Sequence, residues 1–164
     1  MPPKAPPSAL EKALRLLSVR ALSGAELTVR LRRAGFPPEE VAAAVRECAK
    51  HRYIDDALLA EDCAGSWQRR GHGARSIRCK LRQRLIPQEL ADAALAATAE
   101  HETETAENAI EAKLPSLLRE KDPMKRKAKA LRFLAARGFS PEAIRAAMAR
   151  LRDAVRETEE DTEL

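Results

Sequence analysis

Apolar residues along the first 50 positions recur every three or four residues, which is the spacing of one face of an α-helix. Helix-start and helix-stop signals divide this stretch into three predicted helices. They run from Ser8 to about Arg20, from the capping-box pair Ser23 and Glu26 to the stop signal Gly35, and from Pro38 to about Lys50. The residues expected to face inward are Leu10, Ala13, Leu14, Leu17, Leu27, Leu31, Val41, Val45 and Cys48.

The same apolar pattern returns twice, at offsets of 50 and then 53 residues. The matching sets are Leu27, Leu31, Phe36 and Val45; Ile77, Leu81, Ile86 and Leu95; and Ala130, Leu134, Phe139 and Met148. The turns over residues 34–39, 84–89 and 137–142 also correspond. Repetition at this period is typical of arrays in which each unit packs mainly on its neighbours. The sequence therefore predicts an all-α fold, an elongated tandem array of three three-helix repeats with about nine helices.

The ends of the chain and the start of the third unit depart from this regularity. We expect a disordered Pro-rich leader over residues 1–7, repeats over 8–54, 55–101 and 102–156, and a frayed, solvated acidic tail over 157–164. Pro115 should break or kink the first helix of the third repeat, because proline lacks a backbone N–H donor. A fresh helix should then begin after Asp122.

The charge of the chain points to an anionic partner. Its 164 residues carry a net charge of +5, and the last eight include five acids and no base, so the remainder is close to +10. A chain with this positive charge is expected to bind nucleic acid or an acidic protein surface. No apolar run approaches the roughly 20 residues that a bilayer span needs. The first eight residues lack the apolar core of a signal peptide, and the three cysteines form no C-x-x-C pair, so we expect a cytoplasmic protein.

Most of the distinctive positive charge lies between Asp62 and Glu89, on two predicted helices around a Gly71–Gly73 elbow. On the second of these helices, an inward stripe of Ile77, Leu81 and Leu85 is expected, with three arginines on one flank. The predicted binding surface consists of Arg69, Arg70, Arg75, Arg78 and Arg82. A secondary basic patch is expected at Lys125, Arg126, Lys129 and Arg132. The competing interpretation is that these residues only form solvated helix faces.

Two other classes of function are weighed against a binding surface. The chain has no P-loop, no nucleophile-elbow motif and no His–carboxylate metal motif, so we expect neither an enzyme nor a metal or cofactor. Asp55 and Asp56 are interpreted as a helix cap, not as a catalytic pair. The second class is a helix-turn-helix-like protein that contacts DNA directly, with Arg75, Arg78 and Arg82 in a major groove.

The repeat and the middle segment together resemble the RecX family of bacterial regulatory proteins, over residues 9 to 151. The segment Ile54-Asp55-Asp56-Ala57-Leu58-Leu59-Ala60 is followed by the elbow Arg70-Gly71-His72-Gly73, and then by Ile77 and Leu81. The structural signature is thus Asp55, Asp56, Ala60, Gly71, Gly73, Ile77 and Leu81. The sequence departs from the family pattern at five positions. Leu59 and Cys63 replace aromatics, Trp67 an arginine, Ala74 a proline and Leu85 the glycine that ends this helix.

The resemblance implies a non-enzymatic modulator of the RecA recombinase, and we expect the chain to be a monomer. Proteins similar to this one bind the RecA–single-stranded-DNA filament and suppress its ATPase, strand exchange and growth in recombinational DNA repair. The resemblance therefore implies that the partner is the RecA filament, together with single- or double-stranded DNA. It implies neither a cofactor nor a membrane partner.

Overall fold

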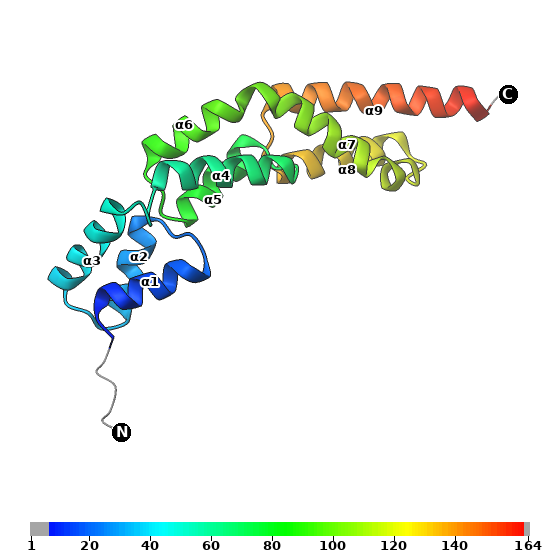
Figure 1. Ribbon diagram of the computed structural model, residues 1–164. Helices are drawn as coiled ribbons and strands as arrows, with labels where there is room; N and C mark the ends of the chain where they lie inside the picture. The colour runs from blue at the N-terminus through cyan, green and yellow to red at the C-terminus, as the bar shows by residue number, and fades with distance from the viewer. Residues whose placement is uncertain (1–6, 163–164) are drawn as a thin grey trace.

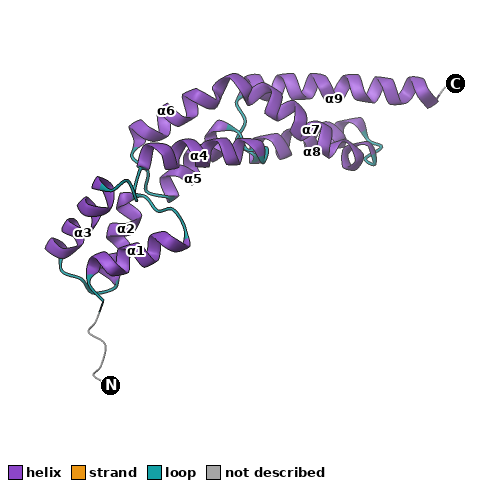
Figure 2. Ribbon diagram, in the orientation of Figure 1, coloured by secondary structure: helices purple, strands orange, loops and turns teal. Residues whose placement is uncertain are grey.

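The computed structural model describes residues 7–162, and within them it is entirely helical, with no strand (Figures 1 and 2). The helices of the first repeat are α1 (Ala9–Val19), α2 (Gly24–Arg33) and α3 (Pro38–Lys50). Those of the second are α4 (Asp56–Arg69), α5 (Ala74–Gln83) and α6 (Gln88–Thr98). A 3-10 turn, η1 (Ala99–His101), leads to α7 (Glu102–Leu118), α8 (Pro123–Ala136) and α9 (Pro141–Thr162) of the third. The predicted all-α array of three-helix repeats is confirmed.

The repeats follow one another as a bent, elongated array (Figure 1). The helices α1 to α3 form a bundle at one end, and α9 projects at the other, so the two ends of the described part of the chain lie far apart. An array of this shape exposes a long surface instead of enclosing one deep pocket.

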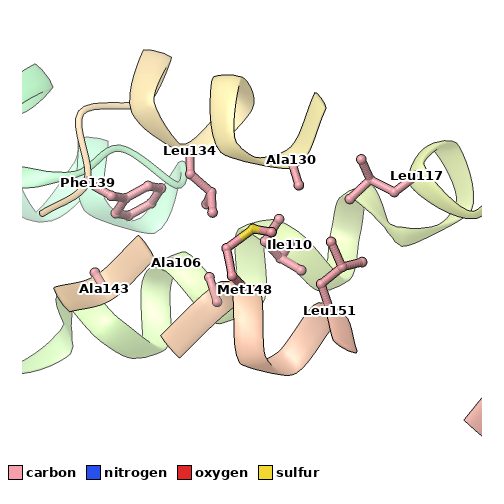
Figure 3. Close-up of a cluster of buried hydrophobic side chains, with 10 residues drawn as sticks. Ala106, Ile110, Leu117, Ala130, Leu134, Phe139, Ala143, Met148 and Leu151 are labelled. Carbon is pink, nitrogen blue, oxygen red and sulfur yellow. The ribbon is translucent and has the colours of Figure 1, made fainter. Parts of the chain in front are cut away.

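Each repeat buries its own apolar cluster, and the positions predicted from the repeat supply the centre of each one. Leu31, Leu81 and Leu134, which are equivalent in the three copies, are each 0% exposed. A fully buried leucine of this kind stabilises the fold by about 1.5–3 kcal/mol relative to an exposed one. In the third repeat, Ile110 of α7 lies beside Met148 and Leu151 of α9 in one apolar cluster (Figure 3).

The last residue of three helix-terminating turns adopts a positive φ, as a Schellman-type C-terminus requires. Gly35 ends α2 with φ +92° and Gly138 ends α8 with φ +78°, and the equivalent Leu85 has φ +53°. In each turn the next N–H donates back to a carbonyl five residues earlier, as from Ile86 to Leu81 at 3.1 Å. Leu85 therefore takes the conformation of the glycine that it replaces.

Four expectations from the sequence need correction or qualification. Leu85 is 44% exposed and does not belong to the buried stripe, because its positive φ turns it out of the helix. Leu14 is 40% exposed, because α1 packs instead through the small residues Ala9 and Ala13. Pro115 does not break α7, which continues to Leu118, where the buried Leu117 holds the last turn on the core.

The acidic end also differs from the expectation, since α9 continues through it to Thr162. Residues 157–162 are therefore helical, not frayed. Residues 163–164, and residues 1–6 of the expected leader, lie outside the described part of the chain.

Candidate functional site at the junction of repeats 2 and 3

The elbow between α4 and α5 meets the turn between α8 and α9 backbone to backbone. The Gly73 N–H donates to the carbonyl of Arg137 at 2.8 Å, and the Arg75 N–H donates to the carbonyl of Gly138 at 3.1 Å. A Cβ atom on Gly73 would overlap the backbone of Phe139. Glycine is therefore required here for close approach, which gives the elbow of the family signature a structural reason.

A single carboxylate reinforces this junction. Oε1 of Glu102, at the start of α7, accepts hydrogen bonds from the N–H groups of Ala74 at 2.9 Å and Ser140 at 3.3 Å. These N–H groups lie at the N-termini of α5 and α9, where helix dipoles favour negative charge. Three helices of two different repeats are thereby fixed to one another.

Beside the elbow lies an open groove of about 890 Å³ between the end of α4, α7 and the end of α8. Four cationic residues line it, Arg69, Arg70, Lys113 and Arg137. The remaining lining residues are Gln68, Gly71, His101, Glu104, Thr105, Asn108, Ala109, Ala112 and Phe133. Glu104 is the acid among them. The groove is thus predominantly cationic, with the phenyl ring of Phe133 on its wall.

The aromatic ring of Phe133 lies close to two of these cations. Lys113 Nζ is 5.4 Å from the ring centroid, and the guanidinium carbon of Arg137 is 5.2 Å from it. Arg137 also donates from Nη1 to the carbonyl of Arg70 at 2.9 Å. Its guanidinium is therefore held in place at the groove wall by the backbone of the neighbouring repeat.

The electrostatic potential at the elbow is positive, as the lowered pKa of His72 indicates. Burial lowers the pKa of His72, and the charges of Lys80, Arg137 and Arg70 lower it further. A second proton is unfavourable where cations already gather. The same field favours an anionic ligand in the adjoining groove.

The structure brings together only two of the five arginines of the predicted binding surface. Arg69 and Arg70 line the groove, whereas Arg75, Arg78 and Arg82 do not. Arg75 donates from Nη2 to the carbonyl of Ala135 at 2.8 Å, and Arg78 forms an ion pair with Asp92. Arg82 is exposed and has no hydrogen-bond or ion-pair partner within the described residues.

The predicted secondary patch on α8 is divided in the same way. Lys129 donates from Nζ to the carbonyl and hydroxyl oxygens of Ser116 at 3.0 and 3.1 Å, and Arg126 donates from Nε to the carbonyl of Glu120 at 3.0 Å. Lys125 and Arg132 are exposed. Two of these four cations therefore hold α8 against the end of α7 and the loop that follows it.

The two aspartates of the signature have different roles. Asp55 caps α4 by accepting from the Leu58 N–H at 2.9 Å, as predicted. Asp56 instead reaches the first repeat and accepts from the N–H of Gly24, at the N-terminus of α2, at 2.9 Å. The other signature positions Ala60, Ile77 and Leu81 are buried, with exposed fractions of 1% or less.

Sequence reasoning did not identify the contacts that join repeats 1 and 2. Arg84 donates from Nε and Nη2 to the carboxylate of Glu26 at 3.0 and 3.1 Å, and also from Nη2 to the carbonyl of Ala21 at 2.7 Å. Ser23 donates its hydroxyl to the carbonyl of Arg84 at 2.8 Å. Burial by itself would raise the pKa of Glu26, but hydrogen bonds from Arg84, the Ser23 N–H and Arg20 outweigh it and lower the pKa.

Sequence reasoning also missed Lys113 and Phe133 in the groove. No local motif marks them, because they meet Arg69 and Arg70 only through the packing of repeat 3 on repeat 2.

Among the described residues, no group of three or more His, Cys, Asp or Glu side chains is placed to hold a metal ion. No helix in the same part of the chain is long and apolar enough to cross a membrane.

Comparison with known proteins identifies three consecutive domain matches. Models of the first, second and third three-helix domains of RecX match residues 9–48, 55–95 and 100–148. The chain is 37% identical over 139 residues to the regulatory protein RecX of Chlorobaculum tepidum, with 84% of each chain covered. It is 35% identical to the regulatory protein RecX of Vibrio campbellii, with 81% of this chain and 84% of the relative covered.

Solved structures agree with the fold. The crystal structure of RecX from Lactobacillus salivarius matches with a TM-score of 0.78 at 20% identity, over 87% of this chain and 94% of that one. A second crystal structure, of a regulatory protein RecX, matches with a TM-score of 0.74 at 23% identity.

Proposed function

The chain belongs to the RecX family, and from that premise we propose that it binds the RecA–single-stranded-DNA filament and restrains the ATPase, strand exchange and growth of that filament. The observation that carries the proposal is the match of all three family domains in order along the chain. The family resemblance supplies the filament as partner. The basic groove at the junction of repeats 2 and 3 supports an anionic component in the surface that is bound.

Backbone hydrogen bonds between two repeats fix the walls of the groove relative to each other. Arg69 and Arg70 come from repeat 2 and Arg137 from repeat 3, and the elbow joins the two repeats through backbone hydrogen bonds. The relative positions of their backbones are therefore set before a partner arrives, so that the ordering on binding is confined to side chains. An elongated array also allows contacts over several protomers of a helical filament.

The test is RecA ATP hydrolysis on single-stranded DNA, with this protein titrated from well below the recombinase concentration up to equality. Inhibition is expected from the unaltered chain. The variant Arg69→Glu/Arg70→Glu should raise the half-inhibitory concentration by about tenfold or more, because two cations of the groove become anions. No inhibition by the unaltered chain would contradict the proposed function.

The matched control is Arg32→Glu/Arg33→Glu, which changes an exposed arginine pair in the last turn of α2, much as Arg69 and Arg70 lie at the end of α4. The control should inhibit almost as well as the unaltered chain. An equal loss in both variants would mean that only total charge matters. Full inhibition by the Arg69→Glu/Arg70→Glu variant would show that the groove does not contact the filament, but it would not contradict the proposed function.

Direct DNA binding is the second candidate, and the four cations that line the groove favour it. Binding of labelled single- and double-stranded DNA should be measured at several salt concentrations. If the groove contacts phosphates, log K falls with log salt at a slope set by the number of contacts. Tight binding with base preference, and no effect on RecA ATPase, would favour the DNA-binding function.

A further inference from the structure

A second groove, remote from the elbow, lies between the first turns of α8 and the middle of α9. Its volume is about 260 Å³. Pro123, Met148, Leu151 and Val155 provide its apolar surface. Four cationic residues line it as well, namely Arg126, Lys127, Arg152 and Arg156. Neither the repeat pattern nor the proposed function accounts for this combination of an apolar floor with a cationic rim.

Three of the four rim cations are free to meet a ligand. Lys127, Arg152 and Arg156 are exposed and have no hydrogen-bond or ion-pair partner within residues 7–160. Arg126 uses only its Nε, as donor to the carbonyl of Glu120. Three unpaired cations around one small apolar groove form a concentrated positive surface.

The acids of α9 are mostly directed elsewhere. Asp153 and Glu157 follow the same helix face as Arg150, which forms an ion pair with Glu111 at 2.7 Å. Glu159 lies four residues after Val155, so it follows the groove face one turn further on. Asp122, at the N-terminus of α8, already accepts hydrogen bonds from the N–H groups of Met124 and Lys125. Glu160 lies four residues after Arg156, at the edge of the rim, so Glu159 and Glu160 are the acids among the described side chains of α9 that oppose a negative ligand.

We propose that this groove binds an acidic peptide segment that carries hydrophobic side chains. The cationic rim pairs with the carboxylates of such a peptide, and the floor of Met148, Leu151 and Val155 removes its apolar side chains from water. A nucleic-acid backbone would satisfy the rim but would leave the apolar floor without a partner. The combination of a cationic rim and an apolar floor therefore favours an acidic peptide with hydrophobic side chains over nucleic acid.

The acidic end of a second copy of this chain is the nearest rival occupant. Residues 157–164 supply five acids, yet Leu164 is their single apolar residue. That segment matches the rim but offers little to the floor. Self-association through this groove would appear as a concentration-dependent increase in mass, which sedimentation can measure.

The experiment uses three fluorescent synthetic peptides of twelve residues and the full chain. The first consists of Asp and Glu with two leucines four positions apart, the second has serines in place of these leucines, and the third has lysines in place of the acids. Anisotropy titration should show binding of the first peptide. About tenfold weaker binding is expected for the serine peptide, because two side chains no longer reach the apolar floor. No binding is expected for the lysine peptide.

Three variants assign the site. Arg152→Ala/Arg156→Ala changes exposed side chains only, and it should weaken binding of the leucine peptide by about tenfold. Val155→Ser should weaken the leucine peptide and leave the serine peptide unchanged. Glu159→Gln should tighten binding of both peptides, because it removes one of the acids beside the rim. The Arg32→Glu/Arg33→Glu variant is the control and should bind normally.

Three results would overturn the proposal. Equal binding of the leucine and serine peptides would show a charge effect without the apolar floor. Displacement of the leucine peptide by single-stranded DNA, at equal concentrations of DNA phosphate and peptide carboxylate, would identify a nucleic-acid site. Concentration-dependent dimerisation abolished by Arg152→Ala/Arg156→Ala would identify a second copy as the occupant. None of these measurements uses RecA, so they do not depend on the proposed function.

Discussion

At the scale of single residues, the helix-terminating turns carry the clearest stability consequences. Leu85 occupies a positive-φ position where both other repeats have glycine. A left-handed conformation costs a non-glycine residue about 1–2 kcal/mol. Leu85 is also 44% exposed, so little burial is lost by its replacement. Leu85→Gly should therefore stabilise the chain by about 1 kcal/mol in urea unfolding, despite the entropic cost of glycine.

The control for this prediction is Gly35→Ala. A Cβ atom on Gly35 would meet nothing within 4 Å, but its φ of +92° remains unfavourable for alanine. The variant should lose about 1 kcal/mol for backbone reasons alone. Gly35→Ala could be destabilising while Leu85→Gly is neutral or also destabilising. That result would show that the contacts of the Leu85 side chain stabilise the fold by more than its backbone strain destabilises it.

Gly73 serves a different purpose from Gly35, because its neighbours leave no room. In Gly73→Ala the new methyl group would overlap the backbone of Phe139, and backbone cannot move as a flexible side chain does. The variant should lose more than about 2 kcal/mol by overpacking. Gly65→Ala is the matched control, since its methyl would meet only the end of the Arg69 side chain at 3.2 Å. This control should be neutral or slightly stabilising in the same thermal melts.

What the sequence predicts well is local or periodic. The repeat offsets identify Leu31, Leu81 and Leu134 as equivalent core positions, and Asp55 is recognisable as a helix cap. The pairing of Glu26 with Arg84 is not predictable, because 58 residues separate the two and no pattern links them. The same limit applies to the binding surface. The helical wheel places Arg75 and Arg78 on one flank, but it does not show that Ala135 and Asp92 engage them.

At the scale of elements, Glu102 fixes the N-termini of two helices with one carboxylate oxygen. Replacing it by glutamine keeps the shape and an acceptor oxygen but removes the charge that favours both helix dipoles. Glu102→Gln should lose about 1–2 kcal/mol of unfolding free energy. Glu104→Gln, which changes an exposed acid two residues away, should be nearly neutral. Equal effects in the two variants would mean that the two hydrogen bonds to Glu102 contribute little to stability.

At the scale of the whole molecule, the two junctions differ in kind. Repeats 2 and 3 meet through backbone hydrogen bonds at the elbow, which side chains such as Glu102 reinforce. Repeats 1 and 2 instead meet through hydrogen bonds that each involve a side chain, at Glu26, Ser23 and Asp56. Each repeat also has a separate apolar cluster. Cooperativity in such arrays depends on the interfaces between units. The orientation of repeat 1 therefore depends on a few charged and polar groups.

The Glu26 carboxylate makes this junction sensitive to acid. Its pKa is lower in the folded chain than its ordinary value of 4.5, so the folded state binds the proton less well than the unfolded state. The stability contributed by the carboxylate is complete above that ordinary value and is lost as pH falls through the folded pKa. Glu26→Gln removes this dependence. The difference in unfolding free energy between the unaltered chain and the variant should therefore shrink as pH falls below about 4.5.

Hydrogen exchange measured by mass spectrometry locates the effect along the chain. Arg84→Met leaves Glu26 with Arg20 as its remaining cationic partner, and an inadequately paired buried charge costs about 3 kcal/mol. Protection should fall in residues 9–50 while residues 102–150 keep theirs, because the elbow junction is untouched. The double variant Glu26→Gln/Arg84→Met should recover part of the loss, since no buried carboxylate remains and Arg20, which loses its ion pair, is 42% exposed to solvent. A uniform loss of protection over all three repeats would instead mean that the array unfolds as one cooperative unit, with repeat 1 coupled to the elbow through more than this ion pair.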